Sequence, residues 1–265
     1  MDSEANLAYL ESLPELRPGE TFVFDCNPGV PCFNRCCAEL TLPLSPYDVL
    51  RLRRQLQMPS EEFVATFVRL HYHEDTGFPM PMLRMLQGPG EPCPFVSQAG
   101  CTVYEDRPGA CRYYPLGRGA SMGRDGVVER FYLVREDHCR GFDVGTARTP
   151  AEWYADQDLA GYNRSNDRYM RLMSLVRATG RPLELKLVNM AMLCLFQLDR
   201  FRELIGNMKL FDRVEAEDRR ELVMGDSLAA DEAALDFGMD WLELVVFGTC
   251  PTLERKPSPR QESPS

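Results

Sequence analysis

The sequence lacks an excess of positive charge, a long apolar run and a basic, apolar leader. Its 265 residues carry a formal net charge of −10, which argues against a nucleic-acid partner because phosphate contacts need surplus lysine and arginine. The longest apolar run, residues 187–198, has about twelve residues, whereas a bilayer span needs roughly 20, so we expect no membrane partner. The acidic N-terminus has neither a secretory nor a transit pattern. We therefore expect a cytoplasmic protein.

Motifs of several enzyme classes are also missing. No Ser–His–Asp arrangement, carboxylate pair or phosphate-binding loop stands out, and no glycine-rich loop indicates an S-adenosylmethionine site. Of the three histidines, His71 and His73 would lie near the end of a predicted helix and face different directions. His138 adjoins a cysteine and is a candidate to donate a hydrogen bond near a metal. The sequence therefore leaves open whether the protein is an enzyme.

Ten cysteines are present, and they are spread unevenly. Eight of them precede residue 140, in a stretch rich in proline and glycine. Because thiols stay reduced in a cytosol, a disulfide framework is disfavoured, and metal or redox chemistry becomes the leading use for them. This skew predicts a cysteine-rich metal-binding domain over residues 1–147, a helical region over 148–250 and a disordered tail over 251–265.

Turn-forming residues flank these eight cysteines, which suits metal ligands on loops. Thiolates bind zinc and iron strongly, and ligands that are close in sequence lower the entropic cost of assembling a site. The adjacent pair Cys36–Cys37 cannot comfortably chelate one ion, so it indicates two sites, or one metal and one packing role. Eight ligands would fit two four-thiolate sites, and one site with spare thiols stays open. The predicted ligands are Cys26, Cys32, Cys36, Cys37, Cys93, Cys101, Cys111 and Cys139.

The identity of the metal does not follow from the number of ligands. Structural zinc and iron–sulfur clusters both take four thiolates. Short Cys-x2-Cys knuckles, which are common in structural zinc sites, are absent here, and the spacings are uneven. We therefore prefer an iron–sulfur cluster as the cofactor and keep zinc as the alternative.

A longer motif surrounds the later cysteines. Cys93-Pro94-Phe95 is followed by Gly100-Cys101-Thr102-Val103-Tyr104-Glu105-Asp106-Arg107-Pro108-Gly109-Ala110-Cys111-Arg112-Tyr113-Tyr114-Pro115. Together with the upstream group ending in Cys36-Cys37 and the later Cys139-Arg140-Gly141, this string resembles the YkgJ-type cysteine-cluster family, which is described as zinc- or iron-chelating. The resemblance covers about residues 22–145 and implies metal binding through the eight cysteines. A weaker similarity, at the cysteines alone, is to flagellin lysine N-methylase, an iron–sulfur protein.

Charged and aromatic side chains accompany Cys111. Arg107 and Arg112 flank it, and they could offset the negative charge that several thiolates bring to a metal. Salt bridges with neighbouring acids are the alternative. We expect the nearby tyrosines to pack around the site and shield it from solvent. The acids are Glu91, Glu105 and Asp106, and the tyrosines are Tyr104, Tyr113 and Tyr114.

Local signals predict the helices and strands. Ser45-Pro46-Tyr47-Asp48 and Thr149-Pro150-Ala151-Glu152 are capped helix starts. Ser60-Glu61-Glu62 begins a further helix whose apolar face extends to Leu70. The fold class is α+β and predominantly helical: an irregular cysteine-rich metal-binding domain with short strands, packed on a C-terminal helical region. Helices are predicted over 46–57, from 60 to beyond 70, and over 150–158, 160–178, 184–206 and 229–246, with short strands over 22–24, 82–86 and 130–134.

The predicted function is metal binding through the eight cysteines, used for electron transfer or metal handling. One alternative is a cluster-dependent enzyme such as a protein lysine N-methylase. Another is a structural zinc module that recognises a protein partner through the helical half. An open coordination position beside a pocket would favour an enzyme, since closed four-thiolate sites do no Lewis-acid chemistry.

Overall fold

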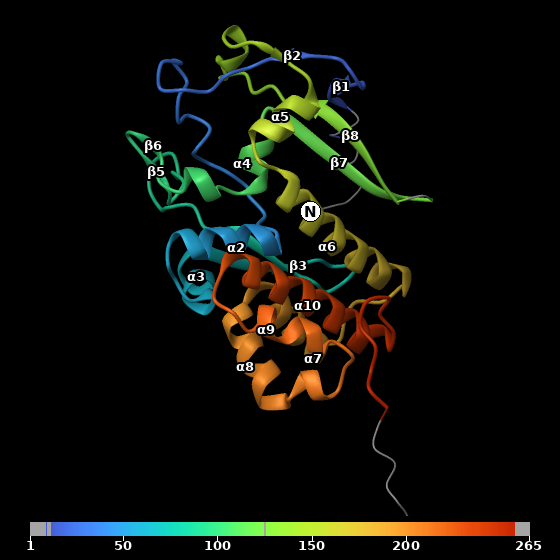
Figure 1. Ribbon diagram of the computed structural model, residues 1–265. Coiled ribbons are helices and arrows are strands. Elements are labelled where there is room, and N and C mark those ends of the chain that lie inside the picture. Colours follow the sequence, from blue (N-terminus) through green and yellow to red (C-terminus); the bar gives the residue numbers. More distant parts are fainter. Residues whose placement is uncertain (1–8, 10–11, 125, 258–265) are drawn as a thin grey trace, which may run out of the picture.

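The computed structural model describes residues 9, 12–124 and 126–257, and it has mixed α+β architecture (Figure 1). Most helices gather in one half of the molecule, while the strands pair into small antiparallel sheets. The predicted α+β class is confirmed at this level. The helices are α2 (Pro46–Gln55), α3 (Ser60–Phe67), α4 (Gly109–Tyr113), α5 (Pro150–Asp156), α6 (Ala160–Ala178), α7 (Leu185–Phe196), α8 (Leu198–Met208), α9 (Arg220–Val223) and α10 (Leu228–Phe247).

The strands make one three-stranded sheet and three two-stranded pairs within the described residues. The longest pair is the hairpin of β7 and β8, to whose outer edge β1 adds. Strands are present at each of the three predicted places, although β4 ends before residues 84–86. The strands are β1 (Glu15–Leu16), β2 (Phe22–Val23), β3 (Val68–Tyr72), β4 (Pro79–Leu83), β5 (Val96–Ser97), β6 (Gly100–Cys101), β7 (Leu116–Gly123), β8 (Gly126–Leu133) and β9 (Ala147–Arg148).

Both predicted capped helix starts are confirmed, and each of them forms a capping box. At the start of α2, the Ser45 hydroxyl accepts from the Asp48 N–H at 3.2 Å, and the Asp48 carboxylate accepts from the Ser45 N–H at 2.7 Å. Thr149 and Glu152 make the same reciprocal pair at α5. In each case the residue after the cap is a proline, which has no N–H and so leaves one unsatisfied donor fewer in the first turn.

Two predicted helices end differently in the structure. The second predicted helix stops at Phe67, and Val68–Tyr72 forms strand β3 against β4. The prediction that this helix continued through Leu70 to the two histidines is wrong, because Val68 and Leu70 serve a strand equally well. The predicted helix 184–206 is divided at Gln197, whose φ of −128° and ψ of 58° are not helical. This break lets α7 and α8 each turn an apolar face toward the core.

The large hydrophobic core draws on both sides of the predicted boundary at residue 147. Phe63 and Phe78 come from the first part of the chain, and Leu172, Phe201 and Phe237 come from the second. Helix α10 lies at the centre and contacts α2, α6, α7, α8 and α9. The helices α2 and α3 therefore belong to the same packed body as the later helices.

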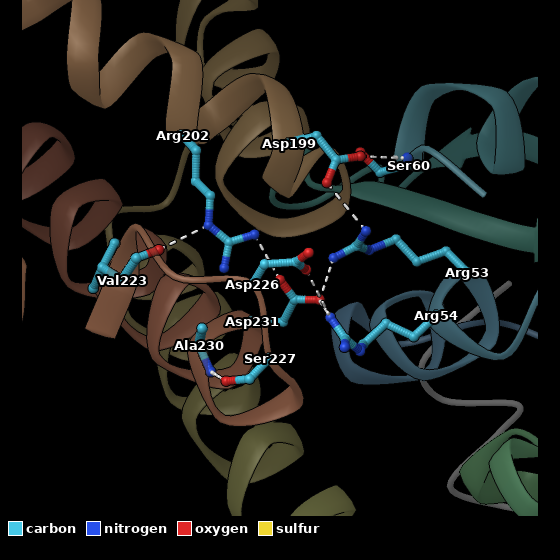
Figure 2. A network of polar contacts seen from close by, with 10 residues as sticks. All are labelled: Arg53, Arg54, Ser60, Asp199, Arg202, Val223, Asp226, Ser227, Ala230 and Asp231. Atoms are coloured by element: carbon cyan, nitrogen blue, oxygen red, sulfur yellow. Dashed lines mark hydrogen bonds and ion pairs between the residues drawn. The ribbon is translucent and has the colours of Figure 1, made fainter. Parts of the chain in front are cut away.

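Buried charges also join these helices (Figure 2). The carboxylate of Asp231, on α10, accepts from Arg53 and Arg54 on α2 and from Arg202 on α8. Asp199 pairs with Arg53 at 3.1 Å and accepts from the Ser60 N–H, at the start of α3, at 2.7 Å. Because a buried carboxylate needs such partners, this network ties four helices together.

A second, smaller core lies among the N-terminal strands. Its centre is Phe24, whose ring meets Trp153 of α5 edge-on at 5.7 Å and Tyr114 at 5.5 Å. T-shaped packing of this kind is the favoured aromatic geometry. Two predicted metal ligands are part of this core. Its buried members, called the small core below, are Phe22, Phe24, Val30, Cys32, Leu116, Cys139 and Trp153.

The segment predicted as a disordered tail, 251–265, is only partly described. Leu253 is buried, and the backbone N–H of Lys256 donates to the Arg213 carbonyl at 2.9 Å. Residues 258–265 lie outside the described residues. Among the helices of the described chain, none has the length and apolar character needed to cross a membrane.

Candidate metal centre

The eight predicted cysteine ligands all lie in the described part of the chain as free thiols. Their mutual electrostatic contacts fall mostly within two groups of four, although Cys36 of the first group also acts on Cys37 and Cys111 of the second. The first thiol group is Cys26, Cys32, Cys36 and Cys139. The second thiol group is Cys37, Cys93, Cys101 and Cys111. Cys194 and Cys250 are instead buried in the large core.

This grouping differs from the order of the cysteines in the sequence. Sequence spacing placed Cys37 with the first three cysteines, whereas its contacts are with Cys36, Cys111 and Cys93. Spacing placed Cys139 with the later cysteines, whereas it lies near Cys26 and packs in the small core. The signal in the sequence was the adjacent pair Cys36–Cys37, which indicated that two neighbouring thiols serve different sites.

The first thiol group is built on the small core. The Cys32 sulfur accepts a hydrogen bond from the backbone N–H of Arg140 at 3.1 Å, which fixes the turn at residues 30–33 against the loop that carries Cys139. Burial raises the pKa of the Cys26 thiol to about 11, and the thiols of Cys36, Cys32 and Cys139 add to that increase. A bound cation would offset the repulsion that these neighbouring thiols exert on the Cys26 thiolate.

Close packing around Gly141 explains why a glycine is found just after Cys139. A Cβ at this position would lie 2.5 Å from the Phe24 ring and 2.6 Å from the Asp25 carbonyl oxygen. The backbone there also accepts from the Asp25 N–H at 3.0 Å. Only a residue without a side chain allows the loop after Cys139 to approach the segment before Cys26 this closely.

The second thiol group surrounds the β5–β6 hairpin. The backbone N–H groups of Phe95 and Val96 hydrogen-bond to the Cys93 sulfur, but burial outweighs them and raises the pKa of this thiol. The N–H of Val103 does the same for Cys101, whose pKa burial also raises. N–H donors aimed at sulfur stabilise a metal-bound thiolate. They are part of what a four-thiolate site requires.

Cys111 lies on the short helix α4. Part of this residue faces solvent, but protein atoms surround its sulfur, and burial raises the pKa of the thiol to about 12. The thiols of Cys93 and Cys101 add to that increase. Helix α4 therefore contributes the fourth member of the second thiol group.

The two thiol groups meet at Cys36–Cys37. The Cys37 thiol donates to the Cys36 sulfur, which lowers the pKa of Cys36 to about 7 and raises that of Cys37. Next to this pair, the Cys93 N–H donates to the Cys37 carbonyl at 2.8 Å, and the Asn34 side-chain amide donates to the Ser97 carbonyl at 3.0 Å. The loop that carries the first group is thus anchored to the hairpin that carries the second.

The residues between Cys101 and Cys111 position the second group. The buried Arg112 guanidinium donates to the backbone carbonyls of Glu105, Arg107 and Gln157. Arg107 donates to the Tyr104 carbonyl at 2.8 Å and stacks 3.7 Å from the Tyr104 ring centre. These arginines take carbonyl and amide oxygens as hydrogen-bond partners instead of the carboxylates that the salt-bridge alternative required. They hold the loop against α5.

The tyrosines and histidines have different surroundings. Tyr104 is exposed, and the Arg107 guanidinium stacks on its ring. Tyr114 lies beside the Cys139 thiol, and burial raises the pKa of Tyr114. Tyr113 donates to Asn163 of α6. Of the histidines, His71 is exposed on β3 and His138 is half-buried in the turn before Cys139. Tyr114 and His138 both adjoin the predicted ligand Cys139.

A cavity of about 390 Å³ opens beside the Tyr104–Arg112 loop. Its lining is polar and carries both signs of charge, since Arg51, Arg107 and Arg112 face Asp106 and Asp156. None of the eight cysteines lines it. The arrangement that would favour an enzyme, a metal ligand facing a pocket, is therefore not found at this cavity.

Eight thiols provide enough donors for two four-thiolate sites, but they are not closed around a metal position. Within residues 9, 12–124 and 126–257, no three His, Cys, Asp or Glu side chains are arranged closely enough to hold an ion. A tetrahedral zinc site with Zn–S bonds of about 2.3 Å needs sulfurs roughly 3.8 Å apart. The sulfurs of each group would therefore have to move closer together to ligate one ion.

Comparison with known proteins adds one match. Residues 25–140 match the CxxCxxCC family model, whose description reads "Putative zinc- or iron-chelating domain". The match begins just before Cys26 and ends just after Cys139, so it contains both thiol groups. No curated protein and no solved structure matches the chain.

Proposed function

From the match of residues 25–140 to the zinc- or iron-chelating CxxCxxCC family model, we propose that the protein belongs to this YkgJ-type family, which the sequence resembles. We also propose that it holds two metal centres, one in each thiol group. Each centre takes four cysteine thiolates. Iron–sulfur clusters are the preferred occupants and zinc is the alternative. The observation that carries the proposal is the division of eight cysteines into two groups of four around the Cys36–Cys37 pair.

Three features of the chain support the donor role of these thiols. Backbone N–H groups donate to the sulfurs of Cys32, Cys93 and Cys101. Positive charge is near at hand, because Arg107 acts on the Cys101 thiol to lower its pKa. Four thiolates around a divalent ion leave a net negative charge, and such donors and cations stabilise that charge.

The uses we propose are electron transfer and metal handling. An iron–sulfur cluster would supply one-electron chemistry at each thiol group, whereas zinc would crosslink the loops that carry the cysteines. In either case the metal would fasten the small core, which holds Cys32 and Cys139, to the large body that Cys93 and Cys101 pack against. A cluster-dependent enzyme or a zinc module for a protein partner has no comparable feature in its favour.

Metal analysis of ligand variants tests this proposal. We expect protein purified without oxygen to contain iron with acid-labile sulfide, or zinc, in an amount that fills two centres. Cys32→Ser and Cys93→Ser should each remove about half of that metal, since each breaks one four-thiolate site. Cys250→Ser is the control, because Cys250 is a buried thiol outside both groups with Thr252 as its hydrogen-bond partner.

Two outcomes would contradict the proposal. One is metal content that neither Cys32→Ser nor Cys93→Ser changes. The other is an equal loss in the Cys250→Ser control, which would mean that metal content reports general folding. Colourless protein with stoichiometric zinc, and without iron or sulfide, would replace the preferred occupant by its alternative.

A further inference from the structure

Two four-thiolate sites that meet at a single peptide bond cannot assemble independently. We propose that metal binding at the two thiol groups is positively cooperative, with the Cys36–Cys37 peptide and its anchors to the β5–β6 hairpin as the link. This inference rests on the proposed function, since it assumes that both groups bind metal. It concerns how the chain's own residues assemble around the metals.

One loop serves both sites. Residues 26–37 contribute Cys26, Cys32 and Cys36 to the first thiol group and Cys37 to the second. Adjacent residues are joined by a planar peptide whose Cα atoms are about 3.8 Å apart. When a metal fixes Cys37, only the few torsions around this peptide remain to place Cys36.

This loop is already tied to the second thiol group by hydrogen bonds. Cys37 accepts from the Cys93 N–H at 2.8 Å, and the Glu39 N–H donates to the Glu91 carbonyl at 3.0 Å. The side-chain amide of Asn34, on the other side of the pair, donates to Ser97 at 3.0 Å. Inward movement of the β5–β6 hairpin around a metal would therefore carry the Cys36–Cys37 peptide with it.

Both groups must draw their thiols together before they ligate, since no three of the described donor side chains are arranged to hold an ion. Fixing a backbone segment in the arrangement that ligation needs costs free energy, and a segment shared by two sites has to be fixed only once. The first ion meets the cost for residues 34–37, so the second ion binds more tightly.

Charge repulsion opposes this coupling. A divalent ion with four thiolates carries a net charge of about −2, and two such centres repel one another. Cys26 is exposed and the other thiols near the junction are half-buried, so water and salt screen the repulsion, with a Debye length of about 8 Å at physiological ionic strength. We therefore expect the shared loop to dominate at moderate salt and the cooperativity to increase as salt is raised.

The test is a zinc titration of the reduced, metal-free full chain, followed by native mass spectrometry. Two independent, equal sites would leave about half of the molecules with one ion at half-saturation, and unequal independent sites would leave more. A tenfold coupling lowers the one-ion fraction to about a quarter. For the unmodified chain we expect a one-ion fraction of about a quarter at half-saturation. A one-ion fraction of half or above would overturn the proposal.

Two further variants test the route. Insertion of two glycines between Cys36 and Cys37 keeps all eight cysteines but separates the sites, and it should raise the one-ion fraction to half or more. The same insertion between Gly180 and Arg181, in the loop joining α6 and α7, is the matched control and should leave it at about a quarter. If the first insertion binds like the unmodified chain, the coupling does not run through this peptide and the proposal is overturned.

A milder variant keeps the test decisive if the insertion prevents folding. Asn34 has a φ of 68°, which glycine tolerates, so Asn34→Gly removes the bond to Ser97 without backbone strain. It should raise the one-ion fraction above that of the unmodified chain, and no change would overturn the route. Failure of the proposed function looks different: zinc would then bind with no dependence on Cys32 or Cys93, whatever its distribution.

Discussion

The carboxylate of Asp48 accepts a hydrogen bond from the backbone N–H of Gly109 at 2.7 Å. Asp48 also closes the capping box of α2 with Ser45. One buried side chain thus joins the first helix of the large body to α4, which carries Cys111. This bond is a direct structural route from the helical packing to the second thiol group.

Replacement of Asp48 by alanine should therefore weaken both folding and metal binding. We expect a loss of about 1–3 kcal/mol in unfolding free energy, because the Gly109 N–H is left buried without a partner and the cap is broken. We also expect roughly tenfold weaker zinc binding at the second thiol group, the size of effect that outer-shell contacts have. Zinc competition with a coloured chelator measures the second quantity.

Ser45→Ala is the matched control for this prediction. It breaks the same capping box and should cost about 1 kcal/mol, but it leaves the Asp48–Gly109 bond in place. Equal zinc affinities for the two variants would mean that Asp48 acts only as a helix cap.

Gly141→Ala should disrupt the first thiol group. The added methyl group would lie 2.5 Å from the Phe24 ring and 2.6 Å from the Asp25 carbonyl oxygen, so the loop after Cys139 has to move away from Cys26. We expect a loss of about 1–3 kcal/mol, as overpacking costs, and removal of about half of the bound metal. Chemical denaturation and metal analysis check the two effects.

Gly206→Ala is the control for this substitution, because we expect it to stabilise the protein. Gly206 lies inside α8, and no atom lies within 4 Å of the position of an added Cβ. Alanine there should stabilise the protein by about 0.5–1 kcal/mol and leave the metal content unchanged. If Gly141→Ala behaved like Gly206→Ala, the close approach at Gly141 would not matter for the site.

Sequence alone predicts the features that depend on neighbouring residues. The capped starts of α2 and α5 follow from hydrogen bonds within four residues, and the structure has both. The end of α3 could not be predicted in the same way. Val68 and Leu70 fit an apolar helix face and a strand equally well, and the choice depends on pairing with residues 79–83.

The candidate site was predictable in its residues but not in their arrangement. Their density and flanking turns marked the eight cysteines as ligands, and this role stays a prediction. Their division required tertiary contacts: Cys139 joins Cys32 in the small core across more than 100 residues. No local pattern reports such a contact, and Cys36–Cys37 was the one hint of it.

Zinc binding at the second thiol group should release close to four protons per ion. Burial raises the pKa of Cys93, Cys101 and Cys111, and hydrogen bonding to Cys36 raises that of Cys37. Thiols whose pKa is raised are protonated at neutral pH and lose their protons on ligation. Apparent affinity should therefore increase with pH until the pH exceeds the raised pKa values.

The Cys32→Ser variant isolates this group for the measurement. Zinc is added to weakly buffered protein with a pH indicator, and the protons released per bound ion are counted. Release of one proton or fewer would show that the four thiols are not the ligands. Cys93→Ser, which keeps the first thiol group instead, should release fewer protons than Cys32→Ser because hydrogen bonding lowers the pKa of Cys36 to about 7.

Asp231→Asn should destabilise the helical body without affecting the metal centres. The Asp231 side chain is 1% exposed and accepts from Arg202 at 2.6 Å, from Arg54 at 2.9 Å and from Arg53 (Figure 2). Loss of this carboxylate charge deprives three arginine side chains of a shared ion-pair partner. Two of them, Arg53 and Arg202, are largely buried. Breaking a buried ion pair costs about 3–5 kcal/mol, so the melting temperature should fall by roughly 10 °C.

Asp226→Asn is the control for that substitution. Asp226 also approaches Arg54, at 3.7 Å, but its side chain is fully exposed, and such a change should alter stability by no more than about 0.5 kcal/mol. Melting followed by circular dichroism compares the two variants, and metal analysis after purification should find both fully loaded. Equal melting temperatures would show that the buried network adds no net stability. Metal loss in Asp231→Asn would show that the thiol groups depend on the helical body beyond the Asp48–Gly109 bond.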